Sequence, residues 1–168
     1  VRAGGSRRFG RRDFGWHQGG EVVLRYDKRN VLGFATDFVE DWTKSAWSLE
    51  ATWTDGVPFQ DADVYDGISR GDVWNLTISM DRPTFINFLN PNRTFFFNTQ
   101  WFLQAADGHG EGWTQNGPVN VAATFTVQTG YFQDRLLPAM TAIYDFRSAS
   151  GGVLPSIAWR FTENFSAT

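Results

Sequence analysis

The chain has 168 residues, no cysteine and a formal net charge of -3, which suits one domain and excludes disulfides and thiolate metal sites. Aromatic residues make up 17% and charged residues 20% of the chain, so a packed structure is expected rather than wholesale disorder. The many Phe, Trp and Gly residues are typical of β-structure, because aromatic side chains fit pleated surfaces. No run approaches the roughly 20 apolar residues that a membrane helix needs, whereas barrel strands would give only a weak hydropathy signal.

Alternation of apolar and polar residues predicts about eight strands, because successive side chains of a strand point to opposite faces. In chain order the predicted strands are residues 20–27, 31–40, 45–54, 72–81, 93–104, 119–131, 136–147 and 153–162. Most are near the 9–11 residues that a tilted strand needs to cross a bilayer. Phe165 is expected to continue the apolar face of the last strand.

The connections alternate in length, as they do in outer-membrane barrels, which have long extracellular loops and short periplasmic turns. The extracellular connections are then residues 55–71, 105–118 and 148–152. The periplasmic connections are residues 41–44, 82–92 and 132–135. The second of these is long for a turn, and its apolar residues 85–89 are expected to form a short interfacial helix.

The two faces of the predicted strands differ in chemistry. The apolar face carries aromatic residues that gather near strand ends, where Trp and Tyr favour a membrane interface: Trp42, Trp47, Trp53, Trp74, Tyr131 and Trp159. The other face is small or polar, as suits a wet lumen, and its lumen-lining candidates are Glu50, Thr52, Asn75, Thr77, Ser79, Asp81, Asn98, Gln100, Thr124, Thr126, Gln128, Asp145, Arg147 and Arg160. Charged pairs of opposite sign on this face would set up a transverse field in a pore, or else plug a narrow barrel.

These patterns predict an all-β, antiparallel, up-and-down transmembrane β-barrel in the bacterial outer membrane. Backbone groups in lipid must be paired within the protein, which forces such a sheet to close. The alternative is a soluble barrel of the lipocalin kind, whose apolar face lies inside around a ligand. The expected Gly-x-Trp opening motif of that class is absent, since Gly15 and Trp16 are adjacent.

One segment resembles a known family. Residues 81–91, read as DRPTFINFLNP, followed by RTFFF at 93–97 and QWF at 100–102, are similar to a proteobacterial outer-membrane barrel family of unassigned function. Members of that family are porin-like and often encoded beside RND-type exporters. The resemblance implies a role in moving or sensing apolar compounds, and it implies that this chain is a C-terminal portion of a larger barrel. It brings no catalytic residues.

Three groups of polar or charged residues are candidate sites of chemistry. His109 lies in a Gly-rich loop, where a lone histidine is more often solvated, so no enzyme activity is expected. Asp61, Asp63 and Asp66 crowd one loop and are candidate Ca²⁺ ligands, although the EF-hand spacing is absent and an acidic surface loop is the plainer interpretation. Five arginines form a basic run near the start of the chain: Arg2, Arg7, Arg8, Arg11 and Arg12. The net charge of the whole chain is negative, which argues against nucleic-acid binding.

The predicted function is therefore a porin-like channel that passes small or apolar solutes, selecting them by pore size and lumen polarity. No cofactor is expected. The expected partners are outer-membrane lipid and lipopolysaccharide, a small apolar solute, and a second copy or an envelope complex. A structural barrel with a plugged lumen that anchors a partner complex is the rival hypothesis.

Overall fold

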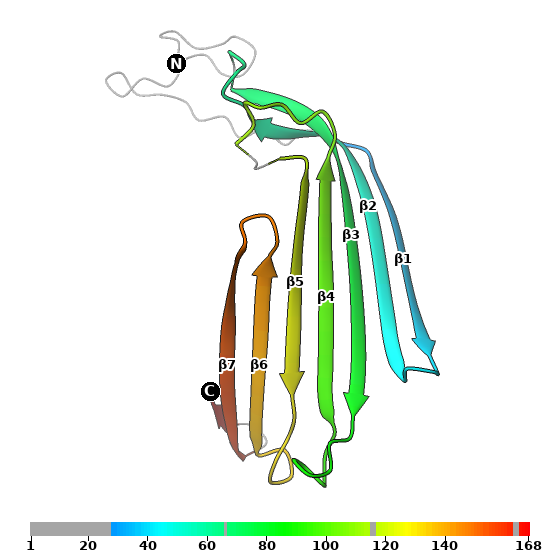
Figure 1. The fold of residues 1–168 in the computed structure, drawn as a ribbon, viewed down its shortest axis with the longest axis vertical. Coiled ribbons are helices and arrows are strands. Elements are labelled where there is room, and N and C mark those ends of the chain that lie inside the picture. Colours follow the sequence, from blue (N-terminus) through cyan, green and yellow to red (C-terminus); the bar gives the residue numbers. More distant parts are fainter. Residues whose placement is uncertain (1–27, 66, 115–116, 163–164) are drawn as a thin grey trace, which may run out of the picture.

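A computed structural model gives the fold, and it forms a single eight-stranded antiparallel sheet in which the strands follow the order of the chain (Figure 1). The structure describes residues 28–65, 67–114, 117–162 and 165–168. The strands are β1 (Val31–Glu40), β2 (Ser45–Gln60), β3 (Ile68–Thr84), β4 (Phe95–Ala106), β5 (Val119–Gln128), β6 (Leu136–Asp145), β7 (Ser150–Thr162) and β8 (Phe165–Ala167). In the described ranges no helix is long and apolar enough to span a membrane.

The all-β antiparallel prediction is confirmed, and seven of the eight predicted strands coincide with observed ones. β1 has the predicted bounds, while β6 ends two residues early, at Asp145. The predicted strand 20–27 lies outside the described residues. The predicted grouping of connections is also confirmed, since in this meander the turns after β1, β3 and β5 share one end. We call it the turn end, and the opposite end the loop end.

Two expectations about chain reversals were wrong. Residues 85–89 form one hydrogen-bonded turn instead of a helix, with the amides of Leu89 and Asn90 both donating to the Ile86 carbonyl at 3.0 Å. Pro91 cannot donate an amide hydrogen bond, so the turn cannot grow. Phe165 does not continue β7 either: the chain reverses, and β8 pairs back on β7 with Trp159 opposite Ala167.

The predicted loop 55–71 is the largest difference between expectation and structure. β2 and β3 continue as a paired hairpin as far as Gln60 and Ile68, beyond a β-bulge between Thr54 and Val57. The bulge adds a residue on one strand and therefore exchanges the faces to which the following side chains point. Val57 thus comes onto the same face as the polar residues of β3, and the hairpin bends across the loop end of the sheet (Figure 1).

A small apolar cluster, which we call the loop-end cap, forms where this hairpin meets the β4–β5 connection. Its members are Val57, Phe59, Val73, Ala106 and Trp113. The Trp113 ring stacks on Phe59 with ring centroids 4.3 Å apart. A Cβ added at Gly71 would lie 2.7 Å from the Trp113 ring, so the missing side chain makes room for that ring.

Away from the cap, the described residues form a single layer, and no second sheet or helix among them packs on either face. Val73, Ala106 and Trp113 are the only buried hydrophobic residues in the described ranges. In the same ranges no strand pairs with the outer edge of β1, and β8 forms the other edge, so the described strands by themselves do not form a closed barrel.

Candidate functional site

Strand register places the predicted lumen residues of β2 to β7 on one face, which we call the polar face. Directly paired residues of antiparallel strands share a face, and the rows include Thr52–Asn75–Gln104 and Ser79–Gln100–Thr124. Side-chain hydrogen bonds link neighbours along these rows. The Gln104 amide donates to Asn75 Oδ1 at 3.1 Å, and the Asn75 amide donates to Thr52 Oγ1 at 3.4 Å.

Other polar-face residues are linked in the same way. The Asn98 amide donates to Asp81 Oδ1 at 2.5 Å, and the hydroxyls of Thr126 and Thr141 lie 2.9 Å apart. Arg147 is the exception among the predicted lumen residues, because it lies in the turn after β6. Its amide donates to Asp145 Oδ1 at 2.8 Å, and its guanidinium donates to the Val119 carbonyl at 3.2 Å.

The charges on the polar face are not joined in ion pairs. In the part of the chain that the structure describes, the salt bridges are Lys44–Asp41 and Arg93–Asp134, and both lie at the turn end. Glu50, Asp81 and Arg160 therefore have no ion-pair partner among the described residues, which is the arrangement expected where water reaches them.

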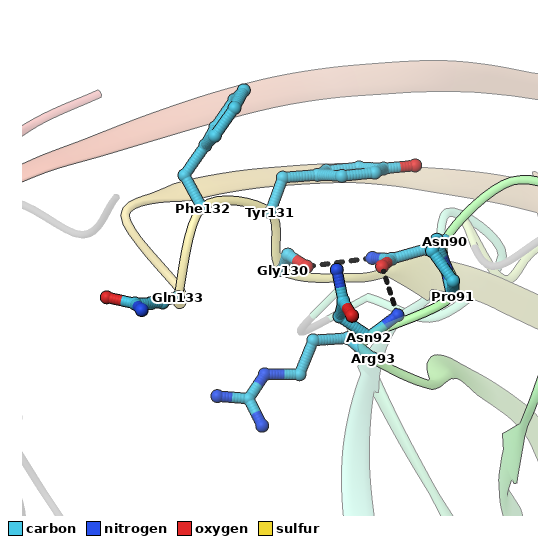
Figure 2. Close-up of a pocket in the computed structure, with 8 residues that line it drawn as sticks. All are labelled: Asn90, Pro91, Asn92, Arg93, Gly130, Tyr131, Phe132 and Gln133. Carbon is cyan, nitrogen blue, oxygen red and sulfur yellow. Dashed lines mark hydrogen bonds between the residues drawn. The ribbon is translucent and has the colours of Figure 1, made fainter.

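At the turn end, a buried hydrogen-bonded contact joins the β3–β4 and β5–β6 connections, and we call it the turn-end junction (Figure 2). Asn90 is 2% exposed, and its amide donates to Thr129 Oγ1 at 3.1 Å and to the Gly130 carbonyl at 2.8 Å. Its Oδ1 accepts from the Asn92 amide at 3.2 Å. Thr129 in turn donates to the Thr94 carbonyl at 2.9 Å. One buried amide side chain thus ties two turns whose sequences are far apart.

The β5–β6 turn itself is strained. Phe132, Gln133 and Asp134 have φ of 53°, 59° and 64°, a left-handed conformation that costs a residue with a side chain roughly 1–2 kcal/mol. Two features hold it. Arg93 binds both Asp134 carboxylate oxygens, at 3.0 and 2.7 Å, and the Phe132 ring lies 6.1 Å from the Trp159 ring.

Three adjoining hollows surround this junction. The largest, of about 510 Å³, lies between the two turns and is the one drawn in Figure 2. A second, of about 430 Å³, opens among Phe96, Gln128, Leu137 and Arg160. The third, of about 280 Å³, is lined mostly by apolar atoms, among them those of Phe95 and Met140. The turn end is therefore the candidate binding region of the described chain.

The proposed calcium ligands lie at the loop end. Asp61 accepts hydrogen bonds from the Ser69 hydroxyl and, at 2.9 Å, from the Asp63 amide. The Ser69 hydroxyl first, and then that amide, lower the pKa of Asp61 below its ordinary value. Asp61 thus fastens the hairpin tip. The described residues contain no group of three potential metal ligands, and Asp66 lies outside them, so the calcium site stays a prediction.

Two further sequence candidates have different outcomes. His109 packs against Trp113, with ring centroids 5.3 Å apart, and so adjoins the loop-end cap. The basic run lies outside the described residues: Arg2, Arg7, Arg8, Arg11 and Arg12.

Sequence reasoning missed the turn-end junction. Asn90 and Thr129 are 39 positions apart and belong to no motif, so no local signal pointed to them. The pair Asn90-Pro91 marked a turn, but not the buried contact that the turn makes. Comparisons with family models, curated proteins and solved structures find no match to the chain, so the resemblance to an outer-membrane barrel family stays a prediction.

Proposed function

We propose that this chain is part of a transmembrane β-barrel of the bacterial outer membrane, and that the barrel passes small or apolar solutes. The observation that carries the proposal is the apolar face of the sheet, which no other described segment covers. Phe34 is 60% exposed, Trp74 56% and Ile157 63%. Apolar patches of this extent on a soluble protein mark an interface, and a lipid bilayer would cover all of them at once.

Strand length agrees with a bilayer. β4 has 12 residues, which span about 40 Å at about 3.4 Å per residue and about 30 Å across a membrane at a tilt of about 40°. Aromatic pairs lie toward both ends of the apolar face: Trp53 with Trp74 at the loop end, and Phe38 with Trp47 at the turn end. Trp101 lies between them, opposite Ile78, so the segregation of aromatic residues is partial.

Side-chain size supports closure with the polar face inside. The rows of that face contain many small residues, among them Gly33, Ala35, Ser48 and Gly152. The apolar face carries most of the Trp side chains of the strands. A closed barrel of few strands has little room inside, so large rings fit the outer surface and small side chains the inner one. A closed barrel also leaves no unpaired backbone groups in lipid.

The unpaired charges favour a wet lumen over a plugged one. The rival hypothesis of a structural barrel expects lumen charges locked in ion pairs. Glu50 and Asp81 have no such partner among the described residues. Selection would then rest on lumen width and on the hydrogen-bonding side chains of the polar face.

Lipid contact can be tested along β3. The chain has no cysteine, so single-cysteine variants at residues 75–80 can each carry one fluorophore. In vesicles whose lipids bear a nitroxide on the acyl chain, quenching is expected at Leu76, Ile78 and Met80. It should be weak at Asn75, Thr77 and Ser79, which serve as matched controls on the same strand.

Quenching without this alternation, or a chain that stays in the aqueous phase without detergent, would refute the membrane assignment. Passage needs a separate measurement, the ion conductance of the native protein in a planar bilayer. Alternating quenching without conductance would retain the barrel and refute the channel.

A further inference from the structure

We propose that the hollow beside Arg160 binds a monocarboxylate with a short apolar chain. This hollow, of about 430 Å³, opens at the turn end of the polar face, and we call it the Arg160 hollow. Its volume falls within the range of small-molecule sites, which are typically apolar with a few placed polar groups. The binding is a property of these side chains and does not depend on the proposed passage of solutes.

Register explains why these side chains meet. Phe96 pairs with Gln128, and Gln128 pairs with Ala139, so the three lie in one row across β4, β5 and β6. On the same face, Leu137 lies one step nearer the turn end and Arg160 two steps nearer, and both line the hollow. An aromatic ring, aliphatic side chains and one amide therefore line the hollow together, beside its charged and hydroxyl-bearing residues.

The electrostatic balance of the hollow is positive. Its charged lining residues are two arginines, Arg93 and Arg160, and one aspartate, Asp134, which leaves one net positive charge. Both carboxylate oxygens of Asp134 accept hydrogen bonds from the Arg93 guanidinium, at 3.0 and 2.7 Å. Arg160 uses its backbone amide to reach the Arg135 carbonyl at 2.7 Å, and among the described residues no carboxylate pairs with its guanidinium. Arg160 is the cation left for a ligand.

The chemistry of the wall narrows the ligand class. A guanidinium can bind both oxygens of a carboxylate in one plane, and the Gln128 amide can donate to the same group. One net positive charge matches a single carboxylate better than a phosphate carrying more negative charge. Phe96, Leu137 and Pro138 line the same hollow, so a short hydrocarbon chain attached to the carboxylate can pack against their apolar surface.

The test uses octanoate as the probe and a cysteine on the wall as the reporter. In Ala139→Cys, the only thiol of the chain lines the hollow, and maleimide should modify it in nonionic detergent. Octanoate is expected to slow this reaction, while octanamide, which has a similar shape and no charge, should slow it much less. Arg160→Gln in the same background should weaken the protection about tenfold to a hundredfold, as expected for a charge-assisted hydrogen bond.

Arg135→Gln is the matched control. It removes the same charge at the residue whose carbonyl binds the Arg160 amide, and its side chain does not line the hollow, so protection should be unchanged. Far-UV circular dichroism in the same detergent confirms that each variant keeps the β-structure of the parent. Equal protection by octanoate and octanamide would overturn the proposal, as would equal losses in the two arginine variants. Because the assay runs in detergent, its failure leaves the lipid-quenching result on β3 standing, and the reverse also holds.

Discussion

Replacing Ile78 with arginine should destabilise the membrane-inserted chain far more than the same replacement at the adjacent Thr77. Ile78 lies near the middle of β3 on the apolar face, opposite Leu49 on one side and Trp101 on the other. If that face meets lipid, the new guanidinium must leave water or deform the bilayer around it.

The expected magnitude follows from the position. An arginine on the lipid face near the bilayer midplane costs about 2–4 kcal/mol, which is about a 30-fold to several-hundred-fold fall in the folding equilibrium. Thr77 lies on the polar face directly opposite Glu50, so an arginine there gains a carboxylate neighbour. Its effect should stay within about 0.5 kcal/mol, as for a surface substitution.

The assay is urea-dependent folding into lipid vesicles, with the folded fraction read from mobility in unboiled SDS gels. Ile78→Arg should shift the midpoint to much lower urea, and Thr77→Arg should leave it nearly unchanged. Equal and small shifts for the two variants would mean that water reaches both faces, and the membrane interpretation of the apolar face would be wrong.

Three other predictions concern the two ends of the sheet. Gln133→Gly should raise the unfolding free energy by about 1 kcal/mol in urea titration, because glycine relieves the left-handed strain; a lower midpoint would contradict this. Asn90→Ala should lower it by about 1–3 kcal/mol, since the buried Gly130 carbonyl loses its donor, and an unchanged midpoint would show that the two turns are not coupled. Acid should loosen the loop-end cap: the Ser69 hydroxyl lowers the pKa of Asp61, so its contribution is complete at neutral pH and is lost as pH falls through the folded-state pKa. Near about pH 5, pepsin should therefore cleave the β4–β5 connection more slowly in the wild type than in Asp61→Asn. Well below the ordinary pKa of 3.8, where Asp61 is protonated, the two proteins should be cleaved equally fast.

The sequence predicted the strands well because each face of a single-layer sheet meets one kind of surroundings. In β1, Leu32, Phe34 and Phe38 share one face, and the predicted bounds of the strand were confirmed. Where the alternation breaks, the prediction failed. Asp55-Gly56 is typical of a turn, yet it belongs to a bulge, and only the pairing of Val57 with Gly71 reveals that the hairpin continues.

The candidate site was predicted only in part. Gln128 and Arg160 were named from alternation, because each belongs to a strand with a regular pattern. The junction around Asn90 depends on a contact between distant turns, which a single sequence does not encode locally. The left-handed turn was not predicted either, because Phe132 and Gln133 are residue types that rarely adopt this conformation.

The bulge in β2 makes the hairpin beyond it a separable module. The register between β2 and β3 shifts by one residue between Thr54 and Val57. The pairing of the strands on the turn-end side of the bulge therefore does not depend on residues 57–71. Insertions at the tip, between Gln60 and Ile68, lengthen a segment that no row of the sheet contains. A peptide tag or epitope placed there should therefore leave strand pairing intact, and this position is the natural choice for displaying foreign sequence on the chain.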